Sequence, residues 1–259
     1  MRPPPPRLSA CCQAAHGLTA DACGRLLTGA LVGLHGCGTG CLVRRISPTH
    51  LLCLEADLRC VIHPRCVLYP AAGTRDLVGA LRQATQLQTL RLGLAGCAIG
   101  DRGTAALASA MPSSLERLRL DLCDCEVGPR GCDALAAALP RSLQHLHLDL
   151  CHCPVHAEGA GALAAALPAL GLNKGGLETL HLDLDNTGVG SEGACALAPS
   201  LPKGLAQLHL DFSRCGVGRE GGRAVAANLP PKLSRLHLDF SGCEIGAEAA
   251  LCLARALPA

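Results

Sequence analysis

A repeat of 28 residues runs from about Leu87 to the C terminus, and it limits what this chain can fold into. Aligned units read L-x-x-L-x-L-D-L/F-x-x-C-x-V/I-G-x-x-G-x-x-A-L-A-x-x-L-P, and the third unit carries six extra residues around Ala169 to Lys174. The six units begin at Leu87, Leu115, Leu143, Leu177, Leu205 and Leu233. A single unit cannot bury its own leucines, so the repeat predicts a stack of units that share one continuous core.

Each unit has a strand-like half and a helix-like half. Apolar residues alternate at Leu118, Leu120 and Leu122, as expected for a short strand with one buried face. The second half has helical spacing, for example at Leu135 and Leu139, within an alanine-rich run. Stacking then predicts an α/β solenoid, a curved horseshoe segment with parallel strands on the concave side and helices on the convex side.

Glycine and proline mark the boundaries within each unit. A glycine pair such as Gly190 and Gly193 precedes most helices, which predicts a tight turn there. Every unit closes on a proline, for example Pro202, which cannot continue a helix.

The unit resembles the leucine-rich repeat. The residues that carry the resemblance are Leu118-x-Leu120-x-Leu122-x-x-Cys125-x-Val127-Gly128, followed by a helix. The repeat length, the cysteine and the helical half are similar to the ribonuclease-inhibitor-like subclass. Thr187 and Ala249 depart from the pattern, standing where Cys and Gly are usual. The resemblance covers about residues 87–259 and implies binding of a macromolecular partner without catalysis.

The N-terminal third does not keep the repeat. We expect a disordered, proline-rich leader over residues 1–15 and an irregular region over residues 16–86, with six repeats over residues 87–259. The helical stretch from Thr74 to Ala84 is consistent with a degenerate repeat that caps the stack. The last unit ends at Pro258-Ala259 without a polar cap, which indicates either a longer repeat array or end-to-end self-association.

A zinc site in the N-terminal third is a weaker hypothesis. Cys53, Cys60, His63 and Cys66 could supply four ligands, but their spacings match no standard finger and Pro64 interrupts them. Buried or incidental thiols are the favoured interpretation.

Composition excludes several classes of function. The formal charge is +2 and no basic run exceeds Arg44-Arg45, so no nucleic-acid footprint is present. No apolar stretch is long enough to predict a membrane span. Eighteen cysteines without a signal peptide favour a reducing compartment, the cytoplasm, with the nucleus as the alternative.

The residues between the strand leucines are expected to form polar columns on the concave face, because strand side chains alternate between the two faces. The candidate partner-binding residues are Arg91, Arg117, Arg119, Asp121, His147, Asp149, His181, Asp183, His209, Asp211, Arg235, His237 and Asp239. Five aspartates form one column and four histidines the next. Positive charge would relieve repulsion between the aspartates, which predicts raised pKa values for the histidines and sensitivity to pH near neutrality.

Two functional hypotheses follow, and an enzyme is not among them, because a catalytic site is normally unique whereas these residues recur in every unit. The favoured one is a non-catalytic scaffold that binds a protein through the concave face and needs no cofactor. The alternative is a metal- or pH-responsive regulatory binding protein that uses the His and Asp columns.

Four cysteines in adjacent units offer a weaker candidate for a thiolate metal site or a redox pair, namely Cys123, Cys125, Cys151 and Cys153. Cys125 and Cys153 belong to a ladder that we expect to point inward, away from the other two, so a structural role is favoured.

Overall fold

The computed structural model describes residues 53–57 and 72–256. Seven parallel strands form one open sheet in chain order, β1-β2-β3-β4-β5-β6-β7. The strands are β1 (Cys53–Asp57), β2 (Thr89–Gly93), β3 (Arg117–Asp121), β4 (His145–Asp149), β5 (Thr179–Asp183), β6 (Gln207–Asp211) and β7 (Arg235–Asp239). The α/β leucine-rich-repeat solenoid predicted from the sequence is confirmed.

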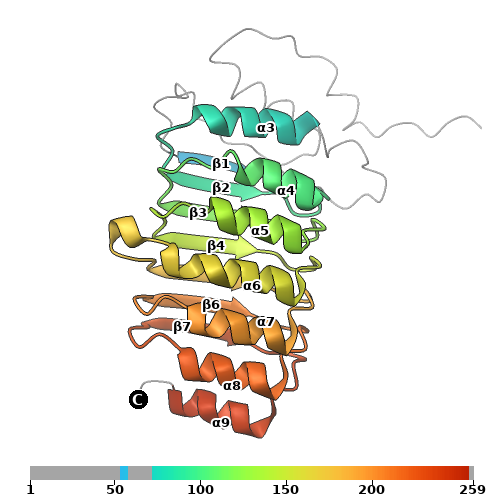
Figure 1. Cartoon of the computed structure of the whole chain (residues 1–259), viewed down its shortest axis with the longest axis vertical. Helices are drawn as coiled ribbons and strands as arrows, with labels where there is room; N and C mark the ends of the chain where they lie inside the picture. The colour runs from blue at the N-terminus through green and yellow to red at the C-terminus, as the bar shows by residue number, and fades with distance from the viewer. Residues whose placement is uncertain (1–52, 58–71, 257–259) are drawn as a thin grey trace, which may run out of the picture.

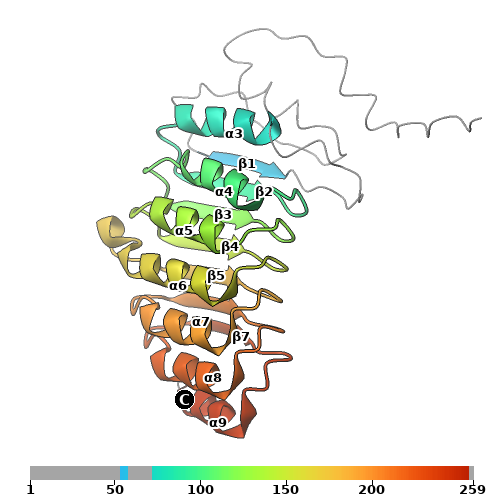
Figure 2. The ribbon, with the colours of Figure 1, turned by 45° about the vertical axis from the view of Figure 1, so that its right-hand side comes forward.

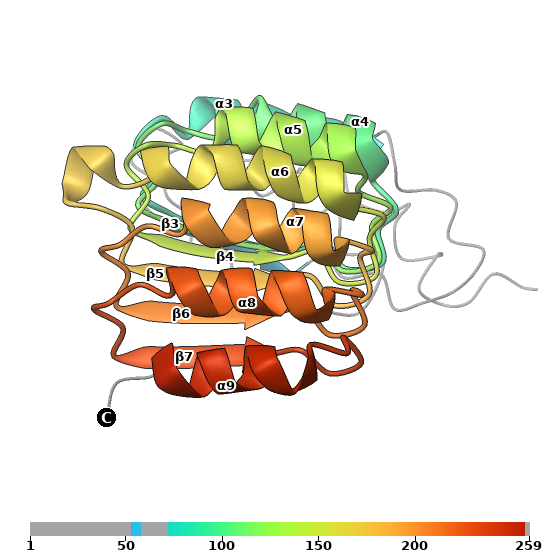
Figure 3. The same cartoon turned by 60° about the horizontal axis from the view of Figure 1, so that its bottom comes forward.

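Helices alternate with the strands and cover one face of the sheet (Figure 1, Figure 3). They are α3 (Ala72–Gln83), α4 (Gly100–Ala108), α5 (Pro129–Ala138), α6 (His156–Ala166), α7 (Gly190–Leu197), α8 (Gly218–Asn228) and α9 (Gly246–Ala256). Figure 2 shows them stacked in chain order along the sheet. The face of the sheet away from these helices is the predicted concave face.

The strand leucines form the core between the sheet and the helices. Leu90, Leu120 and Leu182 are among the fully buried side chains, at most 2 % exposed. They repeat at equivalent strand positions because the register aligns each unit with the next, for example Leu120 with Leu148. Each added unit therefore covers the apolar edge of the one before it.

The two glycines of the repeated pair have different roles. Gly190 has a φ of +66°, in the left-handed region that favours glycine, so it makes the predicted turn. Gly193 lies inside α7, where a Cβ atom would come within 2.9 Å of the Ala160 Cβ on α6. The second glycine therefore allows neighbouring helices to approach closely.

The extra residues of the third unit form a projection that consists of two short 3-10 helices, η4 (Leu167–Ala169) and η5 (Leu172–Lys174). A third, η6 (Ala198–Ser200), follows α7. Gly171 joins η4 to η5 with a φ of +73°, and a Cβ atom there would lie only 2.1 Å from the Gly176 carbonyl carbon. Across the insertion β4 and β5 pair in the same register as the other strands, for example Leu146 with Leu180, so the insertion leaves the stacking of the sheet unchanged.

The two ends of the described stack differ. At the N-terminal end β1 pairs with β2 and α3 contacts α4, in the region where the sequence suggested a degenerate capping repeat. At the other end Leu236, Leu238 and Phe240 are only partly buried, and Leu251 on α9 is 58 % exposed. The leader at residues 1–15, the candidate ligands Cys60, His63 and Cys66, and the terminal Pro258-Ala259 lie outside the described residues.

Candidate functional site

The strand register places the predicted polar columns on the concave face. Three columns of outward-facing residues run across the sheet, at the first, third and fifth residue of each strand. The second column runs through successive partners across the sheet, Arg91, Arg119, His147, His181, His209 and His237. The third column runs through Gly93, Asp121, Asp149, Asp183, Asp211 and Asp239. The arginines and histidines therefore line up directly beside the aspartates.

A first column, whose members sequence reasoning did not group together, lies on the other side of the histidines. It runs through Thr89, Arg117, His145, Thr179, Gln207 and Arg235. In it, the His145 Nδ1 lies 3.1 Å from the Thr179 Oγ1, a hydrogen bond between neighbouring strands. Arg117 and Arg235 are exposed, so this column adds positive charge at separate strands.

The four histidines of the second column form a continuous ring stack. Ring centroids are 3.8 Å apart between His147 and His181, 3.8 Å between His181 and His209, and 4.1 Å between His209 and His237. Interplanar angles do not exceed 19°. The separation of parallel strands, close to 4.8 Å, is what allows equivalent rings to stack.

The predicted rise in the histidine pKa values is wrong for His147, His181 and His209. Partial burial, then the positive charges of Arg119 and His209, lower the pKa of His147 to about 4. Burial, then the neighbouring histidines, lower the pKa of His181 to about 3. Burial and His237 also lower the pKa of His209, although nearby aspartates act in the opposite direction. Partial burial, and then the close approach of the neighbouring positive groups, keep His147, His181 and His209 neutral near pH 7.

Each aspartate of the third column also shapes the chain that follows its strand. The Oδ1 atom accepts a hydrogen bond from the backbone N–H two residues further on, as in Asp149 to Cys151 at 3.0 Å. The same bond follows Asp121, Asp183, Asp211 and Asp239, at 2.8 to 3.3 Å. The sequence signal was an aspartate at the last strand position before a turn, a typical side-chain cap of a turn.

The carboxylates of this column differ in their titration. Burial, then the charges of Asp183 and Asp121, raise the pKa of Asp149 to about 6, although its hydrogen bond from Cys151 acts in the opposite direction. Burial raises the pKa of Asp183 as well. In the last strand the pKa of Asp239 is lowered by hydrogen bonds from Ser241. Negative charge is therefore least favourable in the middle of the column.

The loops after the strands form a polar rim beside the aspartates. In this rim Arg214 forms an ion pair with Asp185, and the side-chain amide of Asn186 lies 2.9 Å from the His152 Nδ1. His152, Asn186 and Arg214 all have left-handed φ values between 55° and 58°, so the loop conformation repeats in successive units. Sequence reasoning missed these pairs because each joins residues of two different units.

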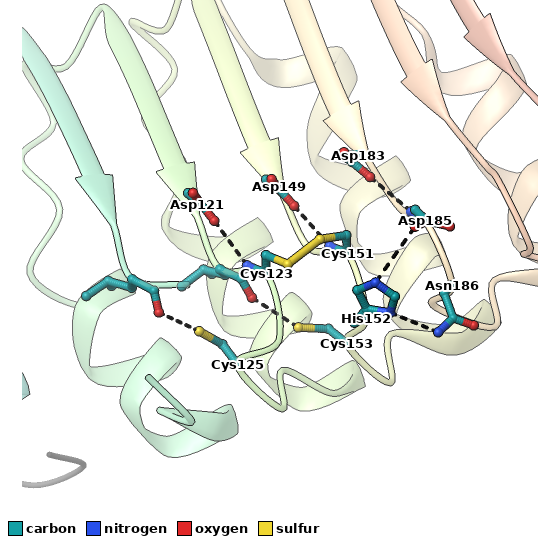
Figure 4. The surroundings of a disulfide bond; sticks show 12 residues. Asp121, Cys123, Cys125, Asp149, Cys151, His152, Cys153, Asp183, Asp185 and Asn186 are labelled. Atoms are coloured by element: carbon teal, nitrogen blue, oxygen red, sulfur yellow. Dashed lines mark hydrogen bonds and ion pairs between the residues drawn. A yellow bond between two sulfur atoms is a disulfide. The ribbon is translucent and has the colours of Figure 1, made fainter. Parts of the chain in front are cut away.

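Cys123 and Cys151 form a disulfide that links the ends of β3 and β4, with Cα atoms 4.6 Å apart (Figure 4). Their side chains are partly exposed. The predicted inward orientation of Cys125 and Cys153 is confirmed, because both are at most 1 % exposed. The four sulfur atoms therefore do not form one ligand group.

The inward cysteines form hydrogen bonds to the preceding unit. The thiol of Cys125 donates to the Leu94 carbonyl at 2.9 Å, and that of Cys153 donates to the Leu122 carbonyl at 3.2 Å. Thr187 takes the equivalent place in the next unit, but its hydroxyl donates to the Leu184 carbonyl of its own unit. Burial raises the pKa of Cys125 to about 12, so this thiol is protonated and structural.

Within the part of the chain that the structure describes, one group of three potential metal ligands lies together: Cys123, Asp149 and Cys151, whose ligand atoms are within 4.8 Å of one another. The His and Asp columns do not add a second such group there. Cys53, the described member of the N-terminal zinc hypothesis, is exposed on β1. None of the described helices combines the length and the apolar character that crossing a membrane requires.

The sequence model of one family, described as "Leucine Rich repeat", matches residues 208–226 and 236–254. Each match begins in a strand, β6 or β7, and ends within the following helix, α8 or α9. No curated protein is similar enough in sequence to match. The family matches and the solenoid together support a leucine-rich repeat protein, a class whose repeats generally mediate protein–protein interaction and are typically non-catalytic.

Proposed function

We propose that this chain is a non-catalytic interaction module that binds a protein partner through its concave face. The observation that carries the proposal is the continuous stack of four imidazoles beside an unbroken column of five aspartates. Both columns run across several repeats, which suits an extended surface contact better than a pocket for a small molecule.

The chemistry of the columns favours a partner with both apolar and basic groups. Neutral stacked rings offer a strip of aromatic surface, which is the type of surface that contributes strongly to binding energy. The adjacent carboxylates attract positive charge and would orient lysine or arginine side chains of the partner. Arg91 and Arg119 lie in line with the histidine stack and make the concave face positively charged toward β2 and β3.

Several finer assignments belong to this proposal. The repeat length and the cysteine ladder support the ribonuclease-inhibitor-like subclass. Most cysteines of the described chain, such as buried Cys215 and exposed Cys195, are free, which supports a reducing compartment, the cytoplasm or the nucleus, whereas the Cys123–Cys151 disulfide argues in the opposite direction. End-to-end self-association stays a prediction that sedimentation velocity of the full chain would test.

A pH-responsive binder is the second candidate, and the histidine stack favours it. Protonation of stacked rings would place like charges about 4 Å apart, at the centroid spacing of His209 and His237. Because the pKa values of His147 and His181 are lowered, the response belongs to acid pH rather than to neutrality.

The test is affinity capture from a source lysate with the full chain and two charge-matched variants. The concave variant changes the five column aspartates to Asn, which keeps the Oδ1 acceptor of each turn: Asp121, Asp149, Asp183, Asp211 and Asp239. The convex control also removes five negative charges, from exposed helix residues: Asp133, Glu158, Glu192, Glu220 and Glu248.

We expect a protein that is retained by the wild type and the convex control but lost from the concave variant. Equal retention by all three chains would show that the aspartate column is not the recognition surface. Loss from both variants would mean that charge in general, not the concave face, holds the partner.

A further inference from the structure

The disulfide Cys123–Cys151 lies at one edge of the concave face, just beyond the column of aspartates at the ends of β3 and β4. The strand register puts Asp121 beside Asp149, so the residues two positions further on also become neighbours, and these are Cys123 and Cys151. In the neighbouring units the equivalent position holds Ala95, Asp185, Ser213 and Ser241. Two adjacent cysteines occur here and not at the other described positions of this row.

We propose that Cys123 and Cys151, once reduced, form with Asp149 a binding site for a borderline-soft divalent cation such as Zn²⁺. A dithiol reductant supplies two electrons and two protons, which break the S–S bond and leave two thiols, while the reductant itself becomes a disulfide. Binding of the cation then releases the two thiol protons to solvent and forms two metal–sulfur bonds. The site goes beyond the proposed partner binding and does not depend on it.

The geometry of the three ligands suits such an ion. Tetrahedral coordination with metal–sulfur bonds of about 2.3 Å places two thiolates about 3.8 Å apart. In the disulfide the two Cα atoms are 4.6 Å apart, just beyond the ends of the paired strands β3 and β4, and the three ligand atoms lie within 4.8 Å of one another. A small rotation of each cysteine side chain therefore opens enough room for the ion.

The Asp149 side chain is oriented for this role by the chain that follows its strand. Its Oδ1 accepts the backbone N–H of Cys151 at 3.0 Å, which fixes the carboxylate next to that cysteine (Figure 4). The second oxygen is left for the cation. Ligands held by hydrogen bonds of this kind orient the metal site and raise its affinity.

The local charge also favours a cation. Asp149 lies between Asp121 and Asp183 in the column, so three carboxylates lie side by side on neighbouring strands. A dication between two thiolates and the Asp149 carboxylate would reduce the repulsion among these carboxylates. Arg119 on the neighbouring column acts in the opposite direction but does not belong to the ligand group.

The ligand chemistry selects the class of ion. Ca²⁺ and Mg²⁺ prefer sites built from oxygen ligands, whereas two thiolates favour zinc and similar borderline-soft metals. The neighbouring His152 is not a fourth ligand in this arrangement, because its ring lies against Asn186 and Asp185 (Figure 4). A fourth position would go to water, as in open zinc sites.

The experiment is a Cd²⁺ titration of the full chain, read by thiolate-to-metal charge-transfer absorbance. It compares the reduced wild type, kept reduced with a phosphine, with the oxidised wild type and with the reduced double variant C123S/C151S. Serine already occupies the equivalent positions 213 and 241, so the double substitution is compatible with the fold. C195S, which removes an exposed thiol on α7, is the matched control.

The reduced wild type should bind one more Cd²⁺ per chain than either the oxidised protein or C123S/C151S, and C195S should behave as the wild type does. D149N should weaken that one site at least about tenfold, while the Asn oxygen still accepts the Cys151 N–H. Equal stoichiometry for the reduced wild type and C123S/C151S would overturn the proposal, because any cation bound would then sit elsewhere. The proposal would also be overturned if C195S bound one Cd²⁺ fewer per chain than the reduced wild type.

Discussion

Acidification should destabilise this protein through the histidine stack. The pKa values of His147 and His181, about 4 and about 3, lie below the ordinary value near 6.5 that the unfolded chain has. The unfolded chain therefore binds more protons than the folded one in this range. The stability that the two neutral rings contribute is present above pH 6.5 and is lost as pH falls from there toward 3.

The size of the effect follows from the linkage relation. Between pH 7 and pH 5 the lowered pKa of each ring reduces the free energy of unfolding by at most about 2 kcal/mol, because one pKa unit corresponds to about 1.4 kcal/mol. Both rings are only half-buried, and solvent screening reduces each cost to about 1 kcal/mol. Asp149, whose pKa is raised to about 6, takes up a proton in the same range and offsets part of the loss. We therefore expect the folded state to be about 1–2 kcal/mol less stable at pH 5 than at pH 7.

The assay is urea unfolding of the full chain at pH 7 and pH 5, with the double variant H147Q/H181Q as comparison. Glutamine does not titrate, so the variant should lose most of the pH dependence that the wild type shows. The same dependence in both chains would refute the assignment to these rings. A wild type that is more stable at pH 5 than at pH 7 would refute the direction of the pKa shifts.

Three further predictions concern stability in urea unfolding. Leu182→Ala removes a side chain that is 2 % exposed and should cost about 2–5 kcal/mol, whereas Leu172→Ala, at 66 % exposed, should change stability by less than about 0.5 kcal/mol; similar costs would contradict the assigned core. Gly171→Ala should destabilise the protein clearly more than Gly175→Ala, because both glycines have positive φ but only at Gly171 would a Cβ atom meet backbone. Equal losses of stability would show that the projection has no such close contact. Cys153→Ala should cost about 1–2 kcal/mol through the lost thiol hydrogen bond and cavity, and full stability of the variant would argue against a structural cysteine ladder.

The regular part of the fold could be predicted because the chain repeats. Once Leu118 and Leu120 are assigned to the buried face of a strand, the repeat assigns the buried face of every later strand. The register then aligns the histidines and the aspartates in columns. The first strand could not be found in this way. Cys53 pairs with Thr89, a spacing of 36 residues that departs from the 28-residue period.

The chemistry of the site was harder to predict than its position. The sequence shows that His181 lies beside Asp183, but it does not show how close stacked rings come or how far they are buried. Those two quantities decide the sign of the pKa shift. The sequence did predict that Cys125 and Cys153 point inward, away from Cys123 and Cys151, but it favoured a structural role for these cysteines over the disulfide that Cys123 and Cys151 form.

The most direct test of the central claim is the dissociation constant of a captured partner for three chains: the wild type, the concave variant with five Asp→Asn changes, and the convex control. If the concave face is the binding surface, the concave variant should bind at least about tenfold more weakly, while the convex control stays within about twofold of the wild type. An unchanged dissociation constant for the concave variant, or a larger loss in the convex control, would contradict binding through the concave face.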